Sequence, residues 1–382
     1  MVLKILLQGF VSAVVGAVLA GTCAYAGNET SDLQVSLDDL SRFGVLGSVL
    51  AVDGPSDYAT TLVSGHVDAE QKTPMTADRA FQIGSQTKTF TAAGILLLAS
   101  QGDLGLDDPV RRYVPQAVEK DDVTIRHLLQ HTSGLGDGID LIDATGEPPA
   151  MEFSLDDILF LGKVQGRTSA PGERWHYNNA GYDILGRIIE VVSGKSRSQF
   201  LRKRLLNPLG MQQTWFGSEE NRIETSMASG YAWSKRDEKA IDMTRPADLT
   251  WASAAGDMIA TAGDLVLWNR SFLGKAREAG LSLDRFIEGA VATELPDMMI
   301  EYGNGLGHFV IAGRSAWGHG GYIHGYVSLS AVDPASGTVV VLLASLRGEP
   351  GTAFPALKNA VTMVVATALS AGARRADDSR VH

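Results

Sequence analysis

The chain has 382 residues, of which 45% are hydrophobic and 20% are charged, a balance that supports a large buried core. Disordered and fibrous proteins are therefore excluded, and one large domain or two interlocked domains are expected. The formal charge of −11 argues against a nucleic-acid partner, because phosphate backbones require a concentrated basic face and no dense Lys/Arg cluster occurs.

Residues 1–26 have the three-part layout of a secretory signal peptide. Lys4 precedes a long apolar stretch, which ends in the small-residue sequence Ala-Tyr-Ala at 24–26. We expect cleavage after Ala26 and an exported protein, either periplasmic or secreted. A retained membrane anchor is one alternative, since the stretch approaches the length of a bilayer span. Lipid modification of Cys23 is another, weaker one.

The first predicted elements of the folded part are strands. A polar linker at 27–40 leads into two short strands at 45–54 and 58–68, which form a hairpin around a turn. A helix at 84–99 follows, with apolar residues on nearly all sides of its axis. Such a helix is expected to lie inside a core.

A mainly helical insert is predicted at about 103–300, where short helices alternate with loops rich in Gly, Pro and Asp. Strand-like patterns begin at Gly305, and a helix at 354–369 follows them. We therefore expect an α+β fold, in which helices flank one antiparallel sheet built from both chain ends. It would form a single domain over 41–372, with a tail at 373–382.

Ser85 and Lys88 lie one helical turn apart at the start of the predicted helix. Lys88 could take the Ser85 proton if burial lowers the lysine pKa, and the unpaired N–H of Ser85 could bind an oxyanion. The alternative is a helix-capping serine beside a solvated lysine. No thiol competes as nucleophile, because Cys23 is the only cysteine and would leave with the signal.

Tyr177 and Asn179 form a second polar pair, just before a helix of regular apolar period. Residues two apart in an extended segment point the same way, so this pair could shuttle a proton and hold a substrate amide. Tyr302 and Asn304 have the same spacing, but the glycines around them suit a turn into the sheet.

A glycine-rich stretch, Gly-His-Gly-Gly-Tyr at 318–322, enters the strand pattern that follows. Gly320 and Gly321 have no side chain to block a ligand, so a substrate backbone could lie along this edge. The Tyr322 N–H could then donate a second hydrogen bond to an oxyanion. A glycine bulge without function is the alternative.

His127 and His131 lie four residues apart, a spacing found in zinc-protease helices. Such helices carry Glu after the first His, whereas this chain has Leu128, and no clear third ligand follows. No metal and no cofactor are expected. His131 is expected to help end its helix.

The order of these elements resembles the serine beta-lactamase-like hydrolases, which include class C beta-lactamases, D-alanyl-D-alanine peptidases and related esterases. The resemblance runs from about 40 to about 370 and is strongest in five segments: 81–115, 124–135, 171–190, 253–268 and 318–345. It implies that Ser85 is a nucleophile that forms an acyl-enzyme and that Lys88 assists its activation. It also implies that Tyr177 is a general acid/base whose phenolate Lys88 would stabilise.

The same resemblance implies that Asn179, His319 and Gly321 bind substrate and that the N–H groups of Ser85 and Tyr322 form an oxyanion hole. The chain departs from beta-lactamases at His319, where a Lys-Thr-Gly motif is expected. A histidine is only partly charged near neutral pH and offers a substrate carboxylate less than a lysine would. Peptidases with this histidine often carry an arginine before it, for which Arg314 is the candidate substitute.

The sequence thus predicts an exported serine hydrolase that works through a Ser85 acyl-enzyme, in first place a D-alanyl-D-alanine carboxypeptidase-like peptidase. Its partner would be a small molecule or a peptidoglycan peptide, and membrane contact is expected only if the N-terminal segment is retained. A monomer is expected. Alternatives on the same fold are an esterase or amidase of small acyl compounds, a beta-lactamase, and a non-catalytic penicillin-binding protein.

Overall fold

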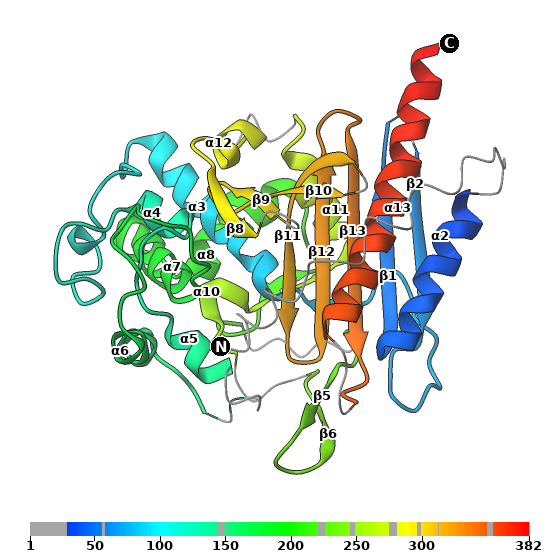
Figure 1. Cartoon of the computed structure of the whole chain (residues 1–382), viewed down its shortest axis with the longest axis horizontal. Coiled ribbons are helices and arrows are strands. Elements are labelled where there is room, and N and C mark those ends of the chain that lie inside the picture. The colour runs from blue at the N-terminus through cyan, green and yellow to red at the C-terminus, as the bar shows by residue number, and fades with distance from the viewer. Residues whose placement is uncertain are drawn as a thin grey trace.

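The structure is a computed structural model, which describes residues 29–55, 58–143, 149, 151–220, 226–244, 249–274, 281–295, 299–311, 313–349 and 354–381. The predicted signal peptide at 1–26 lies outside these residues. Helices and strands alternate along the chain, and strands from its two ends lie side by side in one sheet (Figure 1).

An antiparallel sheet of eight strands forms the centre of the fold, in the order β2-β1-β13-β12-β11-β10-β9-β8. The first and last strands of the chain are neighbours, with Val49 opposite Leu343. This pairing confirms the predicted α+β fold. The strands are β1 (Val45–Asp53), β2 (Ala59–Gly65), β8 (Val291–Leu295), β9 (Met299–Tyr302), β10 (Gly307–Ile311), β11 (Arg314–Ile323), β12 (Tyr326–Asp333) and β13 (Thr338–Leu346).

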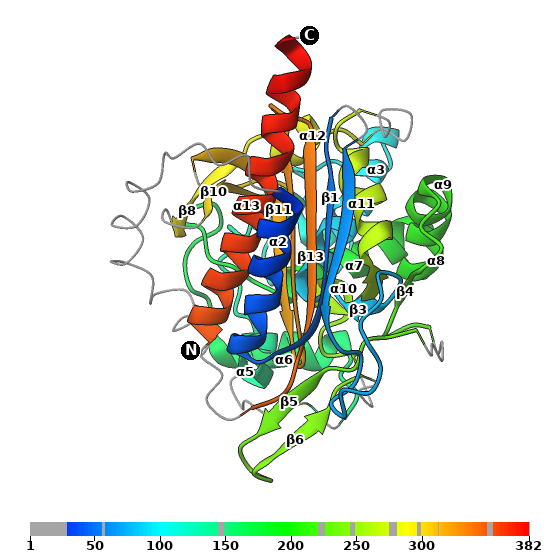
Figure 2. The same cartoon turned by 90° about the vertical axis from the view of Figure 1, so that its right-hand side faces the viewer.

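Helices cover both faces of this sheet (Figure 2). One face packs against α2 (Glu29–Asp38) and α13 (Phe354–Val381), and the other against α11 (Ala262–Ser271). Helix α3 (Thr87–Gln101) lies on the same side as α11, where Phe90 stacks on Trp268. The sheet strands β12 and β13 are buried along their whole length. A strand that is buried on both faces reads as a nearly continuous apolar run, as Thr338–Leu346 does.

Two predictions about the chain ends are wrong. Residues 29–40, predicted as part of a linker, form α2 and the start of a 3-10 helix at Asp39–Phe43. Leu33, Leu37 and Leu40 share one face there and are buried in the cluster that contains α13, which is the spacing of an amphipathic helix. The predicted tail is a continuation of α13, and its Ala373 and Ala376 are buried.

The part of α13 at Pro355–Arg374 is long and apolar enough to span a membrane by length and composition. More than half of its apolar window is buried inside the protein, at 56%. That burial matches a helix of a core, because its apolar side chains pack against the sheet.

The range predicted as a mainly helical insert also contains strands. Besides β8 and β9, it contributes β4 (Thr214–Phe216), β5 (Tyr231–Ser234), β6 (Lys239–Asp242) and β7 (Met258–Thr261), of which β4 and β7 pair in one small sheet with β3 (Ala80–Gln82). Strands of three to five residues are too short for a period of two to be recognised. The helices are α4 (Ile125–Leu129), α5 (Gly138–Asp143), α6 (Leu155–Gln165), α7 (Ala180–Ser193), α8 (Arg197–Leu201), α9 (Asn207–Leu209), α10 (Ser253–Gly256) and α12 (Leu283–Ile287), with a π-helical turn at Arg202–Leu206.

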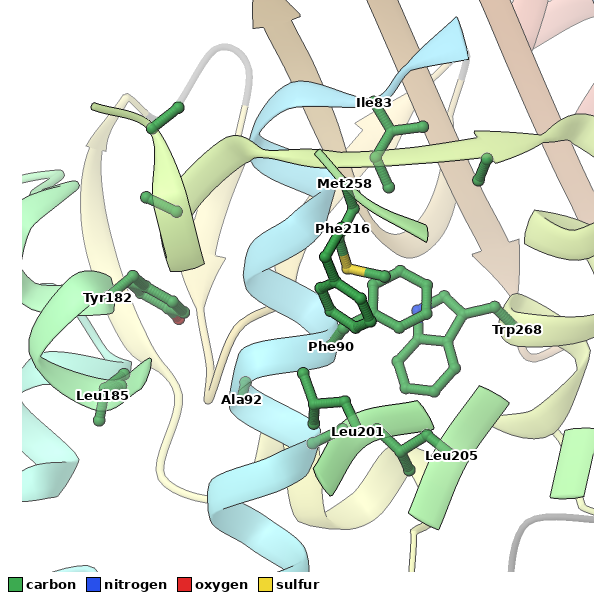
Figure 3. Packing of buried hydrophobic residues seen from close by; sticks show 14 of the residues in the cluster. Ile83, Phe90, Ala92, Tyr182, Leu185, Leu201, Leu205, Phe216, Met258 and Trp268 are labelled. Carbon is green, nitrogen blue, oxygen red and sulfur yellow. The ribbon is translucent and has the colours of Figure 1, made fainter. Parts of the chain in front are cut away.

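Helix α3 lies at the centre of the largest hydrophobic cluster, as predicted for a helix that is apolar on nearly all sides. The ring of Phe90 stacks on Trp268, with 4.1 Å between ring centroids (Figure 3). Gly94 lets α3 approach α7 closely, because a Cβ there would lie 2.7 Å from Ile189 Cδ1. Dense packing on all sides fixes α3, and with it the polar residues at its N-terminus.

Candidate active site

Ser85 lies in a single 3-10 turn, Gly84–Gln86, directly before α3. Gly84 has a φ of 53°, and a Cβ at this position would lie 3.0 Å from the N, C and O atoms of Tyr322. Only glycine combines this conformation with so close an approach. The backbone of Ser85 is therefore held beside strand β11, with the Tyr322 amide on the neighbouring segment.

Lys88 is completely buried and makes three polar contacts through Nζ. The distances are 3.1 Å to Ser85 Oγ, 2.8 Å to Asn179 Oδ1 and 2.8 Å to the Ala255 carbonyl oxygen of α10. The alternative of a capping serine beside a solvated lysine is therefore wrong. Burial lowers the pKa of Lys88 to about 7, although Asp137, Asp183 and Asp140 oppose this shift.

These contacts suit a neutral amine. An uncharged lysine has two N–H bonds and one lone pair, and the two fixed acceptors, Asn179 Oδ1 and the Ala255 carbonyl, account for the two hydrogens. The lone pair is then left for the Ser85 hydroxyl proton. With a pKa of about 7, a large fraction of Lys88 is in this form near neutral pH.

Tyr177 makes a side-chain hydrogen bond with Ser85, so the serine hydroxyl has both Lys88 and Tyr177 as neighbours. The Lys88 Nζ atom lies 4.9 Å from the centroid of the Tyr177 ring. Burial raises the pKa of Tyr177 well above 10. Contrary to the phenolate that the resemblance implied, Tyr177 is a neutral phenol here, because the buried site penalises its anion more than its neighbours stabilise it.

Asn179 is held from both ends of its amide group. Its Oδ1 accepts a hydrogen bond from Lys88, and its Nδ2 donates one to Asp137 Oδ2 at 3.1 Å. Asp137 also accepts from the backbone N–H groups of Asn179, Ala180 and Ile139, at 2.6, 3.1 and 3.1 Å. The carboxylate thus fixes the start of α7 and orients the amide towards Lys88.

Asp137 was missed by the sequence reasoning. It is fully buried, and burial raises its pKa while the N–H groups of Asn179 and Ala180 and the charge of Lys88 oppose that rise. The available signal was an aspartate between two glycines at 136–138, just after the end of the histidine-containing helix. Asp-Gly pairs are common in turns, so this signal is weak.

His319 faces the same site but carries no charge. Its Nδ1 lies 2.5 Å from the Gly320 carbonyl oxygen, and its Nε2 lies 3.0 Å from Tyr302 Oη. A carbonyl only accepts, so the proton sits on Nδ1 and Nε2 accepts from the tyrosine hydroxyl. Burial and nearby Lys88 lower the pKa of His319 to about 3. The expectation of a partly charged histidine is therefore wrong.

Strand β11 contains the glycine-rich stretch, which the sequence pattern did not predict as a strand. Residues 314–318 pair with β10, whereas among the described strands 319–323 pair with β12 alone. Gly321 is required because a Cβ there would collide with the Ile83 carbonyl oxygen, while one on Gly320 would meet nothing closer than 3.7 Å. Gly321 thus allows β11 to lie against the segment that carries Ser85.

These residues surround one cavity of about 310 Å³. Of the predicted site residues, Ser85, Tyr177, Asn179, His319, Gly321 and Tyr322 line it, and Lys88 lies behind Ser85. The rest of the wall is largely aromatic and aliphatic and includes Trp175, Trp251, Leu295, Met299, Tyr302 and Phe309. The structure therefore brings the predicted residues together in an apolar pocket that ends at the Ser85 hydroxyl.

Two other residues that the sequence analysis considered, Arg314 and Asn304, do not reach the site around Ser85. Arg314 starts β11 five residues before His319, about 16 Å along an extended strand, and its Nη1 lies 3.3 Å from Asp333 Oδ2. It does not replace the missing arginine. Asn304 is completely buried and donates to the Arg285 carbonyl, so it supports the turn, whereas Tyr302 belongs to the site through its contact with His319.

The two spaced histidines have structural roles. His127 Nδ1 accepts a hydrogen bond from the Thr124 N–H and completes the cap of α4. His131 has a φ of 57° just after that helix, and its ring lies 4.3 Å from that of Tyr177. Among the residues that the structure describes, no group of three His, Cys, Asp or Glu side chains could hold a metal ion.

Comparison with known families gives a match over most of the chain. The family model described as "Beta-lactamase" matches residues 35–361. Penicillin-binding protein 4 of Amycolatopsis lactamdurans is 31% identical over 333 residues, which cover 81% of this chain and 83% of that protein.

A penicillin-binding protein of Bacillus subtilis is 37% identical over 190 residues, and this match covers 49% of the chain but only 42% of the relative. Among solved structures, the D-amino acid amidase of Ochrobactrum anthropi SV3 in complex with L-phenylalanine superposes with a TM-score of 0.79 at 29% identity. That match covers 92% of this chain and 99% of the amidase.

Proposed function

Because the chain belongs to the Beta-lactamase family, we propose that it is a serine hydrolase that acts by acyl transfer through Ser85. One observation carries this proposal. Lys88 is completely buried, its pKa is lowered to about 7, and its Nζ lies 3.1 Å from Ser85 Oγ. A lysine in this state is a base matched to neutral pH.

Acylation follows from the contacts of Ser85. As Oγ attacks the substrate carbonyl carbon, its proton passes to the neutral Nζ of Lys88. The N–H groups of Ser85 and Tyr322 stabilise the oxyanion that forms on the carbonyl oxygen. The neutral hydroxyl of Tyr177 donates its proton to the leaving group as the scissile bond breaks, and the Lys88 ammonium returns a proton to Tyr177.

Deacylation uses the same groups in reverse. A water molecule attacks the acyl carbon of the Ser85 ester, and neutral Lys88 receives its proton by way of Tyr177. The ester bond then breaks, Ser85 Oγ takes a proton from the Lys88 ammonium, which becomes neutral again, and the carboxylic acid product leaves. Asn179 and Asp137 take no part in proton transfer and keep Lys88 in place throughout.

The pocket favours an amide or ester without a carboxylate next to the scissile bond. His319 is neutral and its Nε2 is bonded to Tyr302, so it offers a carboxylate no positive charge. We therefore place an amidase or esterase first and the carboxypeptidase second. The structural similarity to a D-amino acid amidase supports this order.

The carboxypeptidase remains as a second candidate for one reason. Lys358 of α13 lines the same cavity, and burial lowers its pKa only to about 8, so it stays largely protonated at neutral pH. In a carboxypeptidase substrate the terminal carboxylate lies on the leaving residue, one residue from the scissile bond, so this candidate requires Lys358 to bind that carboxylate. Lys358 belongs to α13, which covers the face of the sheet opposite α11 (Figure 2).

A substrate panel tests these choices on the wild type and on Ser85→Ala. It contains a D-amino acid amide, a short-chain ester, a D-Ala-D-Ala peptide and a chromogenic cephalosporin. We expect turnover of the amide and ester that Ser85→Ala abolishes. Unchanged hydrolysis by Ser85→Ala would exclude the mechanism, whereas turnover of the peptide alone would reverse the order of the candidates.

We also propose that the protein is exported, on the basis of the signal-like segment at 1–26. N-terminal sequencing of the protein recovered outside the cytoplasm should start directly after Ala26. A full-length chain that stays in the membrane fraction would support the retained anchor instead.

A further inference from the structure

The cavity at Ser85 is longer than the proposed chemistry alone requires. Ile311 of β10 and Val361 of α13 also line it. Ile311 lies opposite Arg314, five residues before His319, so the cavity follows β11 for about 16 Å. The ammonia or short alcohol released from the amide and ester of the substrate panel would occupy only the end of the cavity near the nucleophile. The remaining length of the cavity can hold a larger part of a substrate.

A gap in the sheet connects the Ser85 side of the cavity with the α13 side. Strand β10 pairs with β11 only as far as Gly318, and among the described strands residues 319–323 pair with β12 alone. Gly320 has no side chain to close this gap, because even a Cβ there would meet nothing closer than 3.7 Å. Leu329, directly opposite Gly320, lines the cavity and packs in the cluster that contains α13. The cavity therefore reaches the α13 face of the sheet past the free edge of β11.

Phe309 of β10 lines the cavity between its two ends. Its side chain packs against the cluster that contains α13 and against a second cluster, which consists of Trp175, Met299 and Tyr302. Tyr177 packs against this second cluster as well. Because Tyr177 donates the proton to the leaving group in the proposed mechanism, the wall that contains Phe309 lies on the leaving-group side of the scissile bond.

The charges of this wall do not require an ionic ligand. Burial and nearby Lys88 lower the pKa of His319 to about 3, and burial raises the pKa of Tyr302 well above 10, so both rings are neutral. Asp140 and Lys358 are the Asp, Glu, Lys or Arg side chains among the described lining residues, and each has an interaction partner within the protein. An apolar occupant is therefore favoured, since it gains free energy by leaving water for an apolar wall.

Resting on the proposed function, we infer that the part of the cavity between Tyr177 and α13 binds the leaving group of the substrate, and that this group is a long apolar alcohol or amine. The substrate class is then an ester or amide whose apolar chain is attached to the leaving oxygen or nitrogen. The chain departs with the proton that Tyr177 donates, and water hydrolyses the acyl-enzyme that remains. A chain on the acyl side of the scissile bond does not reach this wall.

Three esters separate the two sides of the scissile bond: ethyl acetate, hexyl acetate and ethyl hexanoate. The last two are isomers, which differ in whether the long chain belongs to the alcohol or to the acyl group. Each is assayed below its solubility limit with the wild type. We expect kcat/KM for hexyl acetate to exceed the values for both other esters by about tenfold or more, because its chain is buried along the cavity.

Variants of Phe309 test where the chain binds. Phe309→Ser removes apolar surface from the wall, so the ratio of kcat/KM between hexyl and ethyl acetate should fall below about threefold, mainly through KM. Phe309→Leu should keep most of the ratio. Phe160→Ser is the matched control, because Phe160 lies on α6 and is 65% exposed, and it should keep the wild-type ratio. A ratio taken within one variant is independent of how much of that variant is folded.

The other outcomes count against this site. It would be overturned by a wild type that hydrolyses ethyl hexanoate as well as or better than hexyl acetate, by equal values for all three esters, or by an unchanged ratio in Phe309→Ser. The wild-type comparison decides alone if Phe309→Ser does not fold. Amide hydrolysis that depends on Ser85, without turnover of any ester, would overturn the site and leave the proposed function standing. Absence of Ser85-dependent hydrolysis of every substrate would instead refute the proposed function itself.

Discussion

Tyr302 donates a hydrogen bond to His319, with 3.0 Å between Oη and Nε2. The second ring nitrogen of His319 is bound to the Gly320 carbonyl, so both polar atoms of the side chain are engaged within the protein. Burial of the pair lowers the pKa of His319 to about 3. The position that holds a cation in beta-lactamases is therefore a neutral part of the pocket wall in this protein.

A neutral His319 predicts a small and uniform effect of His319→Gln. Glutamine keeps a polar group of similar reach and adds no charge, so kcat/KM should fall by less than about tenfold, equally for amide and peptide substrates. Steady-state kinetics on both substrates measures this. A loss of a hundredfold or more on the D-Ala-D-Ala peptide alone would mean that a charged His319 binds the carboxylate.

The pKa of Lys88 predicts the pH dependence of the reaction. The base must be deprotonated, so kcat/KM should rise with pH through an apparent pKa near 7 and then level off. His319 should add no second step between pH 5 and 8, because its pKa lies near 3. A pH series with an ester substrate checks this. A rate that is flat from pH 5 to 9 would rule out Lys88 as the base.

The surroundings of Gly320 and Gly321 in β11 predict that alanine substitutions at these two adjacent positions affect activity very differently. In Gly321→Ala the new methyl group collides with the Ile83 carbonyl, which pushes β11 from Ser85 and disturbs the oxyanion donors. We expect a loss of about a hundredfold or more in kcat. Gly320→Ala, whose nearest contact is 3.7 Å, is the matched control and should stay within a few-fold of wild type. Equal behaviour of the two variants would contradict this role of Gly321.

Asp137 predicts a stability effect at a site that contacts no substrate. Asp137→Ala leaves the buried N–H groups of Asn179, Ala180 and Ile139 without their acceptor, which should cost about 3 kcal/mol or more in unfolding free energy. Urea denaturation measures this change in unfolding free energy. Asp156→Ala is the control, because Asp156 is exposed. A change within about 0.5 kcal/mol would show that other acceptors replace the carboxylate.

Sequence patterns predicted those features of the structure that depend on residues close together in the chain. The spacing of Ser85 and Lys88 at a helix start, and the apolar pattern of α3, predicted one turn of separation on a buried helix, and the structure has both. Strand patterns near both ends of the chain predicted that these ends pair in one sheet, and β1 pairs with β13. Strand β11 was missed because glycines at 318, 320 and 321 interrupt the alternation that identifies a strand.

Side-chain contacts between residues far apart in the chain could not be predicted from sequence patterns. Asp137 reaches residues more than forty positions away, and the Ala255 carbonyl reaches Lys88 across 167 positions. The charge state of His319 depends on burial, which is a property of the folded protein and not of the motif. Helix α2 was missed because polar residues such as Gln34, Ser36 and Asp38 surround the leucines and resemble a linker, whereas in the folded protein α13 covers those leucines.

The acyl-enzyme itself gives the most direct test of the mechanism. Acid-quenched reaction with a slowly turned-over ester or a fluorophosphonate, followed by intact-mass and peptide mapping, should show one adduct per chain on Ser85. Ser85→Ala should show none, and Lys88→Met should form the adduct at least about a thousandfold more slowly. An adduct on another residue, or unchanged labelling of Ser85→Ala, would contradict the account.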